Sequence, residues 1–599
     1  MMYLANMNKY IVKLTIFLLI GNSAFSQTFF RNEGNMNISG GFLFIQGSYQ
    51  NENTADISLD GTIKLTGKWI NNASNSVMST TNGIGTVLFA GSGLQTIGGS
   101  STNFFNFEGI TIAPAASVEV SAGMGVSAAG ACDFTSNPLI LRSTTTAFRP
   151  ITATFINNST VTGNITMELS YTGNGSSATG GRALYFSSPI NNANSSIFGA
   201  NGSSNRLFYQ DEINRKYVEI KTPTALTVAK GYFFRSTISP TVYAFTGPPN
   251  ADPSYTTSNI PMADTGHYYL MGNPYPASID WHTITRSNLK STIWYRSCTP
   301  TGEMRIDTYN DSNGHGTDNN LTAAVDGKIP PMQGFWIQDL SVPGPGSITI
   351  SASDRSHNWG SSAFLKSESV TTQDDVFRMY LYHNENRDEM MIIQDESAQD
   401  TFDDWDSRKM FLNDTSVAEL FTLSPEGKSL VIQSVKPILQ QKVFPVGLHI
   451  SSSSMYKFVA NLNDIKSGMS YILIDKLLND SLDLSVDSVY AFQSGAITDN
   501  TGERFELLIG PKNTNNQVTS YINMPTDVNK IIIYSFDKQV FIKRCPLNAE
   551  IAIFDMLGNQ LYISKANSDY EVIPCNFHQG CYIVRVSNPY IAKVQKVIL

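Results

Sequence analysis

A repeat of short β-type runs near the N-terminus constrains the fold more than any other feature of this sequence. Residues 44–51 (FIQGSYQN) are echoed by residues 64–71 (KLTGKWIN), and Gly47 and Gly67 stand 20 positions apart. Similar runs follow at 86–91, 107–112 and 118–120. Such a period predicts a β-solenoid over residues 27–149 whose turns stack their apolar sides inward, with a ladder of Asn side chains around Asn71 and Asn72. An irregular β-sandwich is the alternative.

The composition favours strands throughout the chain. Charged residues make up only 15% of the 599 residues, and Asn, Ser, Thr and Gly are abundant, which suits β-strands joined by polar turns better than long ion-paired helices. We therefore expect an all-β protein of several domains. The net charge of -9, without a basic stripe, argues against a nucleic-acid partner and against electrostatic docking on an anionic membrane.

Turn signals divide the rest of the chain. Residues 150–360 form a β-rich module that contains the strings GNPYP and PPMQGF, and residues 361–374 are a Ser/Thr-rich linker. Alternating runs with turns about every ten residues predict a β-sandwich over 375–511. A final Ig-like sandwich is expected over 525–599.

The N-terminus has the pattern of a secretory signal peptide. Lys9 and Lys13 precede the apolar run 14–20. Ala24 and Ser26 then supply the small residues of a cleavage site before Gln27. The apolar run is shorter than the roughly 20 residues that a membrane anchor needs. We therefore predict a signal peptide over residues 1–26 and export of the mature chain.

Familiar catalytic motifs are missing from the sequence. There is no His-Glu-x-x-His helix, no Gly-x-Ser-x-Gly elbow and no phosphate-binding Gly-x-x-x-x-Gly-Lys-Ser/Thr loop, and the seven histidines are widely spaced. A glycosidase-type pair of carboxylates stays open, because its two groups need only meet in space. The expectation is a protein that is not an enzyme and that holds no cofactor, with calcium as the one exception.

Two acidic segments are candidate calcium loops. DSNGHGTDNN (311–320) offers oxygen ligands at Asp311, Asn313 and Asp318, although its twelfth position is Thr322 instead of a bidentate Glu. DTFDDWD (400–406) concentrates carboxylates, with Asp403, Asp404 and Asp406 as the candidate ligands. The alternatives are a solvated Asn-Gly loop for the first segment and a turn cap for the second.

Aromatic residues around the two Pro-containing strings suggest a ligand surface. Tyr275, Trp281 and Trp336 would stack on a sugar ring if they were exposed. The alternative is structural, because aromatic residues next to Pro commonly close the edge of a sandwich.

The C-terminal pattern predicts a small closed β-unit. Ile551, Ile553, Leu561 and Ile563 are expected to alternate inward around a hairpin at residues 557–559. Gly580 is expected to free the turn before the next strand. Cys575 and Cys581 flank one turn, and the sequence leaves open whether they form a disulfide or a free pair.

Three segments of this terminal unit, IAIFDMLGNQLYI, QGCYIVRV and KVQKVIL, resemble the type A C-terminal sorting domain of the type IX secretion system. The resemblance implies recognition by the outer-membrane translocon. The positions that carry the family pattern, and hence the implied sorting signal, are Ile553, Asp555, Leu557, Gly558, Gly580, Tyr582, Val584, Lys593 and Lys596.

Two other regions are similar to surface proteins of Bacteroidetes-type bacteria. They are GTVLFAGSGLQTIGGSSTNFFNFEGITI (85–112) and the strings YYLMGNPYPASIDW (268–281) and IPPMQGFWIQ (329–338). The resemblance implies a protein on the outer-membrane surface or outside the cell. The missing catalytic motifs and the extended polar β-surface add the expectation of an adhesin-like or structural role. The resemblance to sorting domains also implies a lipopolysaccharide anchor. A host or environmental glycan or protein is the further partner expected of a surface protein. The alternative function is that of a secreted carbohydrate-binding or carbohydrate-active protein.

Overall fold

The computed structural model divides the chain into two compact units. The first comprises residues up to 510 apart from 453–455 and 491–494, and the second is built on 511–599 together with those two short segments. The expected signal peptide and the expected linker lie outside the residues that the structure describes. Those residues are 29–73, 84–100, 105–146, 149–173, 182–199, 204–212, 214–238, 241–250, 252, 254–260, 268–301, 303–319, 324–340, 345–357, 375–384, 386–412, 417–499, 501–512, 531–536, 538–543, 545, 549–568, 570–588 and 591–599.

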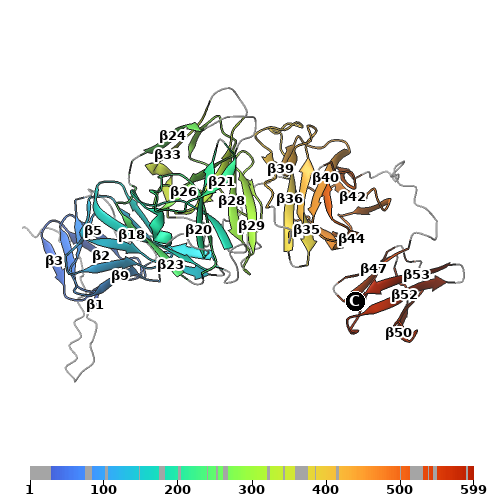
Figure 1. Ribbon diagram of the computed structural model, residues 1–599. Coiled ribbons are helices and arrows are strands. Elements are labelled where there is room, and N and C mark those ends of the chain that lie inside the picture. The colour runs from blue at the N-terminus through green and yellow to red at the C-terminus, as the bar shows by residue number, and fades with distance from the viewer. Residues whose placement is uncertain are drawn as a thin grey trace, which may run out of the picture. The chain divides into compact units, whose positions relative to one another are not determined.

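The first unit begins with a parallel β-solenoid of about 5 turns, as the repeat predicted (Figure 1). Tyr49 pairs with Trp69 and Phe42 with Thr62, one repeat of 20 residues later, and the next turns are slightly longer. The strands are β1 (Phe29–Asn32), β2 (Asn35–Ile38), β3 (Phe42–Ile45), β4 (Ser48–Asn51), β5 (Asp56–Leu59), β6 (Thr62–Leu65), β7 (Trp69–Asn71), β8 (Thr86–Phe89), β9 (Leu94–Gly98), β10 (Phe105–Phe107), β11 (Ile110–Ile112), β12 (Ser117–Val120), β13 (Gly125–Ala128) and β14 (Cys132–Leu141).

Two ladders of side chains stabilise the solenoid turns. The rings of Tyr49 and Trp69 stack with centroids 4.3 Å apart, and Trp69 contacts Phe107 at 5.2 Å. Beside them, Asn32 Nδ2 donates to Asn51 Oδ1 at 3.0 Å, and Asn51 Nδ2 donates to the next Asn of the stack at 3.5 Å. The polar ladder expected near Asn71 is therefore present. Buried amides satisfied in this way fix the register of one turn on the next.

The solenoid extends past residue 149, so the expected boundary at 149/150 is wrong. After the hairpin β15 (Ser143–Thr146) and β16 (Arg149–Thr152), strands β17 (Thr154–Asn157) and β18 (Val161–Tyr171) pair in parallel with β13 and β14. The last edge is then covered by the antiparallel strand β23 (Thr241–Gly247). Covering this edge protects the unpaired backbone groups that a solenoid end would otherwise expose.

The middle of the first unit contains four small sheets, ordered β19-β22-β20-β21, β25-β32-β28-β29-β30, β24-β33-β27 and β31-β26-β34. Their strands and two short 3-10 helices are β19 (Arg182–Phe186), η1 (Ser195–Phe198), β20 (Asn205–Asp211), β21 (Lys216–Glu219), β22 (Tyr232–Ser236), β24 (Ser254–Ile260), β25 (Tyr268–Gly272), β26 (Ser278–Asp280), β27 (Thr285–Ser287), β28 (Thr292–Cys298), β29 (Met304–Asn310), β30 (His315–Gly316), β31 (Lys328–Ile329), β32 (Gly334–Gln338), β33 (Gly346–Ser351), η2 (Ala352–Asp354) and β34 (Arg355–Ser356).

The remainder of the first unit is a twelve-stranded sheet that curls on itself. Phe377 and Tyr471 lie on strands well separated in the sheet order, yet their rings stack 4.8 Å apart. The sheet therefore closes over its own core, as expected for a sandwich. Its strands are β35 (Asp375–His383), β36 (Asn386–Gln394), β37 (Ser407–Arg408), β38 (Glu419–Leu423), β39 (Ser429–Val435), β40 (Lys442–Ile450), β41 (Ser454–Asn461), β42 (Met469–Asp475), β43 (Asp480–Asp483), β44 (Val489–Ser494), β45 (Ile497–Asp499) and β46 (Phe505–Pro511).

The second unit is a two-layer sandwich with a core of its own. Sheets β47-β48-β51 and β50-β49-β52-β53 enclose one apolar cluster that includes Val540, Ile551 and Val584. The strands are β47 (Ile532–Phe536), β48 (Gln539–Lys543), β49 (Glu550–Phe554), β50 (Gln560–Lys565), β51 (Tyr570–Pro574), β52 (Cys581–Asn588) and β53 (Ile591–Ile598). Cys575 and Cys581 do not form a disulfide; both are free thiols.

Helices contribute little to either unit. Across the described part of the chain, no helix is long and apolar enough to span a bilayer.

Candidate functional site

The GNPYP string is held in place by buried hydrogen bonds and does not form a ligand surface. Asn273 Nδ2 donates to the carbonyls of Ala277, Ile329 and Pro330 at 2.8–3.0 Å, and its Oδ1 accepts from the Tyr275 amide at 2.9 Å. The Tyr275 ring is fully buried, and its hydroxyl donates to the Ile350 carbonyl at 3.2 Å. The expected stacking platform at Tyr275 is therefore wrong.

Trp281 is also part of the core. Its indole is fully buried, Nε1 donates to the Ser291 carbonyl at 2.8 Å, and the Arg286 guanidinium covers its ring at 4.3 Å. No ring face is left for a ligand, so the second expected platform is wrong as well. Arg286 in turn links this ring to the first acidic loop.

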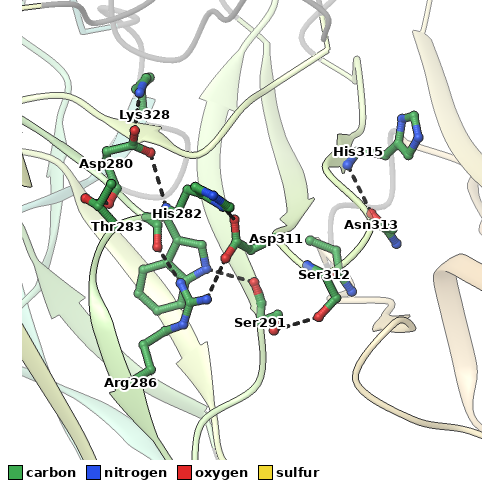
Figure 2. Close-up of polar contacts among 12 residues, drawn as sticks. Asp280, His282, Thr283, Arg286, Ser291, Asp311, Ser312, Asn313, His315 and Lys328 are labelled. Carbon is green, nitrogen blue, oxygen red and sulfur yellow. Dashed lines mark hydrogen bonds and ion pairs between the residues drawn. The ribbon is translucent and has the colours of Figure 1, made fainter. Parts of the chain in front are cut away.

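Asp311, the first residue of that loop, forms ion pairs. Figure 2 shows its carboxylate between Arg286 and His282, with Oδ2 at 2.5 Å from the guanidinium and Oδ1 at 2.9 Å from the imidazole Nδ1. A nearby pair joins Lys328 to Asp280. The Asp311 carboxylate already has a cationic partner in Arg286.

The two acidic segments lie against each other, which the sequence did not reveal. Asn313 Nδ2 donates to the Trp405 carbonyl at 2.9 Å, and Asn310 Nδ2 donates to the Asp404 carbonyl at 3.1 Å. The Asp404 carboxylate accepts from the Ser291 amide at 2.9 Å and from its hydroxyl at 2.6 Å. These contacts join the middle sheets to the twelve-stranded sheet.

The remaining candidate calcium ligands have protein partners. Asp406 accepts from the amides of Ser434 and Asp403 at 2.8 and 3.0 Å, and burial raises its pKa to about 7. Asp403 Oδ1 accepts from the Trp405 amide, and Asp318 pairs with Arg387 at 2.8 Å. Within the described ranges, no group of three or more His, Cys, Asp or Glu side chains is arranged to hold a metal ion. Calcium binding stays a prediction.

The C-terminal positions fall into two groups. Ile553, Tyr582 and Val584 are buried in the sandwich core. The turn at Leu557 is held by Asp555, whose Oδ1 accepts from the amides of Leu557 and Asn559 at 2.9 and 2.8 Å. The Leu557 side chain itself is 89% exposed.

Two expectations about this unit are corrected. Leu561 and Ile563 point to solvent, because a bulge between Ile553 and Phe554 shifts the pairing register of β50. Gly580 has no left-handed φ; its amide and carbonyl pair with Leu599.

Gly558, with φ of 88°, is the residue of this unit that a turn requires to be Gly. Lys593 is half-buried and Lys596 is exposed, both on the edge strand β53.

A candidate ligand site is a cleft of about 610 Å³ in the first unit. It opens where the sheet of β19–β22 meets the sheet of β28 and β32, and a segment following β37 completes one wall. The residues that line it are Tyr185, Gln210, Glu212, Arg215, Tyr217, Tyr268, Arg296, Ile306, Trp336, Lys409, Met410, Phe411 and Leu412. Both its volume and its aromatic lining suit a small organic ligand.

Aromatic packing fixes the floor of the cleft. Trp336 packs edge-on against Tyr185 with centroids 5.6 Å apart, and Trp294 belongs to the same apolar cluster. The Trp294 Nε1 donates to the Arg408 carbonyl at 2.9 Å, which ties the wall segment to the sheets. Gly334 permits the approach of β19, because a Cβ there would lie 2.9 Å from the Tyr185 backbone.

Three polar atoms at this cleft are buried and have no hydrogen-bond partner in the described structure: Glu212 Oε1, Arg296 Nε and Trp336 Nε1. Burial raises the pKa of Glu212 to about 7. Perturbed carboxyls and unsatisfied polar atoms gather at functional sites more often than elsewhere.

Sequence analysis selected only Trp336 of these residues. Tyr217, Glu212 and Arg296 come from unremarkable runs, and the wall at 409–412 comes from a different module. No local motif joins them, so only the fold brings them together.

Comparison with protein families gives one match. A family model described as a domain of unknown function, DUF8693, matches residues 108–508. The match begins inside the solenoid and ends within β46, so it includes the cleft and excludes the C-terminal sandwich. A search of curated proteins finds no match.

Proposed function

The chain belongs to the DUF8693 family, whose function is unknown, and we propose that it is a non-enzymatic, adhesin-like surface protein exported by the type IX secretion system. In this proposal the signal peptide at 1–26 delivers the chain to the periplasm. The C-terminal sandwich then delivers it across the outer membrane, to the surface or the exterior.

The observation that carries the proposal is the independence of the C-terminal sandwich. It has a closed apolar core, it makes up most of the second compact unit, and it lies outside the family match that ends at residue 508. A recognition element that is read separately from its cargo needs these properties. The resemblance to type A sorting domains supplies the identity of the reader, the outer-membrane translocon.

Exposed groups on this sandwich support a recognition role. Leu557 projects from a turn rigidified by Asp555, and Lys596 is exposed on the edge strand. An exposed apolar side chain on a rigid turn costs little ordering entropy when a partner binds it. A lipopolysaccharide anchor added during export belongs to the same proposal.

Removal of the terminal unit tests this proposal. A chain that ends at residue 512 should be made, fold and accumulate in the periplasm of a host that has the type IX system, where surface-added protease does not reach it. The full-length chain should be accessible to the same protease. Normal surface display of the truncated chain would exclude the sorting role.

A second candidate function, glycan binding, is favoured by the cleft. Its aromatic lining includes Tyr217, which is 39% exposed, and such rings pack on the C–H faces of sugars. Glu212 is the one acidic residue among the described residues that line the cleft. A glycosidase uses two carboxyl groups, so binding is the form of this candidate that the cleft supports better than cleavage.

A further inference from the structure

We propose that the cleft binds an acidic saccharide, whose carboxylate accepts hydrogen bonds from Arg296 and Trp336 and whose hydroxyl contacts Glu212. The inference rests on the second candidate function, glycan binding, and specifies the class of ligand. It does not depend on the export route.

Two unused donors carry the argument. Trp336 is only 6% exposed, and its Nε1 has no acceptor within the described structure; the same is true of the buried Nε of Arg296. A buried donor without an acceptor is unfavourable, so a ligand oxygen placed between them would recover the lost hydrogen bonds.

The two donors belong to the same part of the cleft. Trp336 pairs across the sheet with Trp294, and Arg296 is two residues further along β28, so all three side chains share one face. Tyr185 contacts both donors, with the Arg296 guanidinium 6.0 Å from its ring and the Trp336 ring 5.6 Å away. Both side chains thus lie beside Tyr185, where the proposal places the ligand carboxylate.

The charges of the lining select an anion. Its basic residues are Arg215, Arg296 and Lys409, against Glu212 as the acidic one. Lys409 is paired with Asp388, whereas the guanidinium of Arg296, stacked on Phe233 at 5.4 Å, has an unused donor at Nε. A guanidinium with a free N–H is well suited to a carboxylate.

Glu212 favours a ligand that carries a hydroxyl group. Its Oε1 is buried and unpartnered, and its pKa near 7 keeps part of the population protonated at neutral pH. A sugar hydroxyl both donates and accepts, so it can pair with either form of the carboxyl. An acidic saccharide combines this hydroxyl, the carboxylate and a C–H face that can lie on Tyr217.

The test uses the full-length mature protein on an array of paired glycans. Each pair consists of a uronic-acid or sialic-acid glycan and its neutral counterpart, with sulfated counterparts as a third arm. We expect retention on carboxylated members and at least tenfold weaker binding to the neutral ones. The best binder is then titrated in solution.

Matched variants test whether the glycan binds in the cleft. Arg296→Gln should weaken binding of that glycan at least tenfold, and Trp336→Phe, which keeps an aromatic ring but removes the N–H, should weaken it several-fold. Arg31→Gln, at an exposed ion pair in the solenoid, is the charge-matched control and should bind normally. Tyr217→Ala, at the rim, gives a third variant if either buried substitution disturbs folding.

Three results would overturn the inference: no retention of any carboxylated glycan, equal retention of neutral or sulfated partners, or unchanged affinity in the folded cleft variants. None of these bears on export, which is measured separately by surface protease. Failure of the ligand assignment is thus distinguishable from failure of the proposed secretion route.

Discussion

Ser127 Oγ lies 2.7 Å from His357 Nε2, although the two residues are 230 positions apart in the chain. The other imidazole nitrogen, Nδ1, lies 2.8 Å from Thr154 Oγ1, and the ring covers Gly125, where a Cβ would come within 2.5 Å of it. The segment that follows β34 is therefore fastened to strands β13 and β17 of the solenoid. Burial and the nearby charge of Arg355 lower the pKa of His357 to about 3.

This buried imidazole should make the first unit sensitive to acid. The unfolded chain binds a proton at His357 near pH 6.5, whereas the folded chain does so only near pH 3. Between these values the unfolded state binds more protons, so stability is full above pH 6.5 and falls as the pH decreases. The loss attributable to this residue approaches roughly 5 kcal/mol at pH 3.

Urea unfolding at several pH values checks the prediction. All six tryptophans precede residue 406, so tryptophan fluorescence follows the first unit alone. His357→Gln should flatten the pH dependence between 6.5 and 3, whereas His383→Gln, at a less buried ring, should not. An identical slope in wild type and His357→Gln would contradict the account.

The asparagine ladder should contribute measurably to solenoid stability. Asn51 is fully buried, accepts from the Tyr49 hydroxyl at 2.7 Å and donates to the Ala55 carbonyl at 2.8 Å. Asn51→Ala leaves several buried groups unpaired and should lower the free energy of unfolding by about 2–4 kcal/mol. The exposed Asn37→Ala is the control. Equal stability of the two variants, measured by denaturant unfolding, would show that the ladder is dispensable.

The contact between the two acidic loops should contribute to the stability of the first unit. Asp404→Ala removes the acceptor for the Ser291 amide and hydroxyl and should lower the free energy of unfolding by about 1–3 kcal/mol. Asp400→Ala, at a more exposed carboxylate, should lower it much less. Denaturant unfolding of the two variants measures the difference.

Calcium binding is tested with the wild-type protein. A cation that binds only the folded loops must raise the melting temperature, and a chelator must reverse the rise. An unchanged melting temperature would end the calcium proposal.

The sequence predicted the parts of this fold that depend on periodicity. The spacing of Gly47 and Gly67 reports the solenoid because each turn repeats the same local constraint. The end of the solenoid was missed, since the long strand β14 and the hairpin after it hide the period. Leu561 was misplaced for a related reason: a single bulge reverses the face of a strand without changing its alternating pattern.

The cleft could not be read from the sequence. Trp336 was selected from its local string and lines the cleft with only 6% of its surface exposed, whereas Tyr275 and Trp281 came from the same kind of string and are fully buried. The guanidinium of Arg355 lies over the Tyr275 ring, and that of Arg286 over the Trp281 ring. Exposure of an aromatic residue depends on which distant side chains cover it. That information is long-range, and so is the meeting of Glu212 with Arg296.

Export should be more sensitive to substitution of Gly558 than to substitution of Gly580. Its φ of 88° lies in the left-handed region, so Gly558→Val should strain the turn and reduce export. Gly580→Val should be tolerated better, because the nearest atoms lie 3.8 Å from an added Cβ and the backbone there needs no positive φ. The measurement is the ratio of surface to periplasmic protein for the two variants. Equal export by both would contradict the role assigned to the Leu557 turn.

The most direct test of the central claim is transfer of the terminal unit to unrelated cargo. A fusion of residues 1–26, a folded reporter and residues 513–599 is expressed in a host with a functional type IX system and in the same host lacking the translocon. The account predicts protease-accessible reporter on the cell surface or in the medium of the first host, and periplasmic reporter in the second. Reporter that stays in the periplasm of the first host, although the fusion is intact and folded, would contradict it.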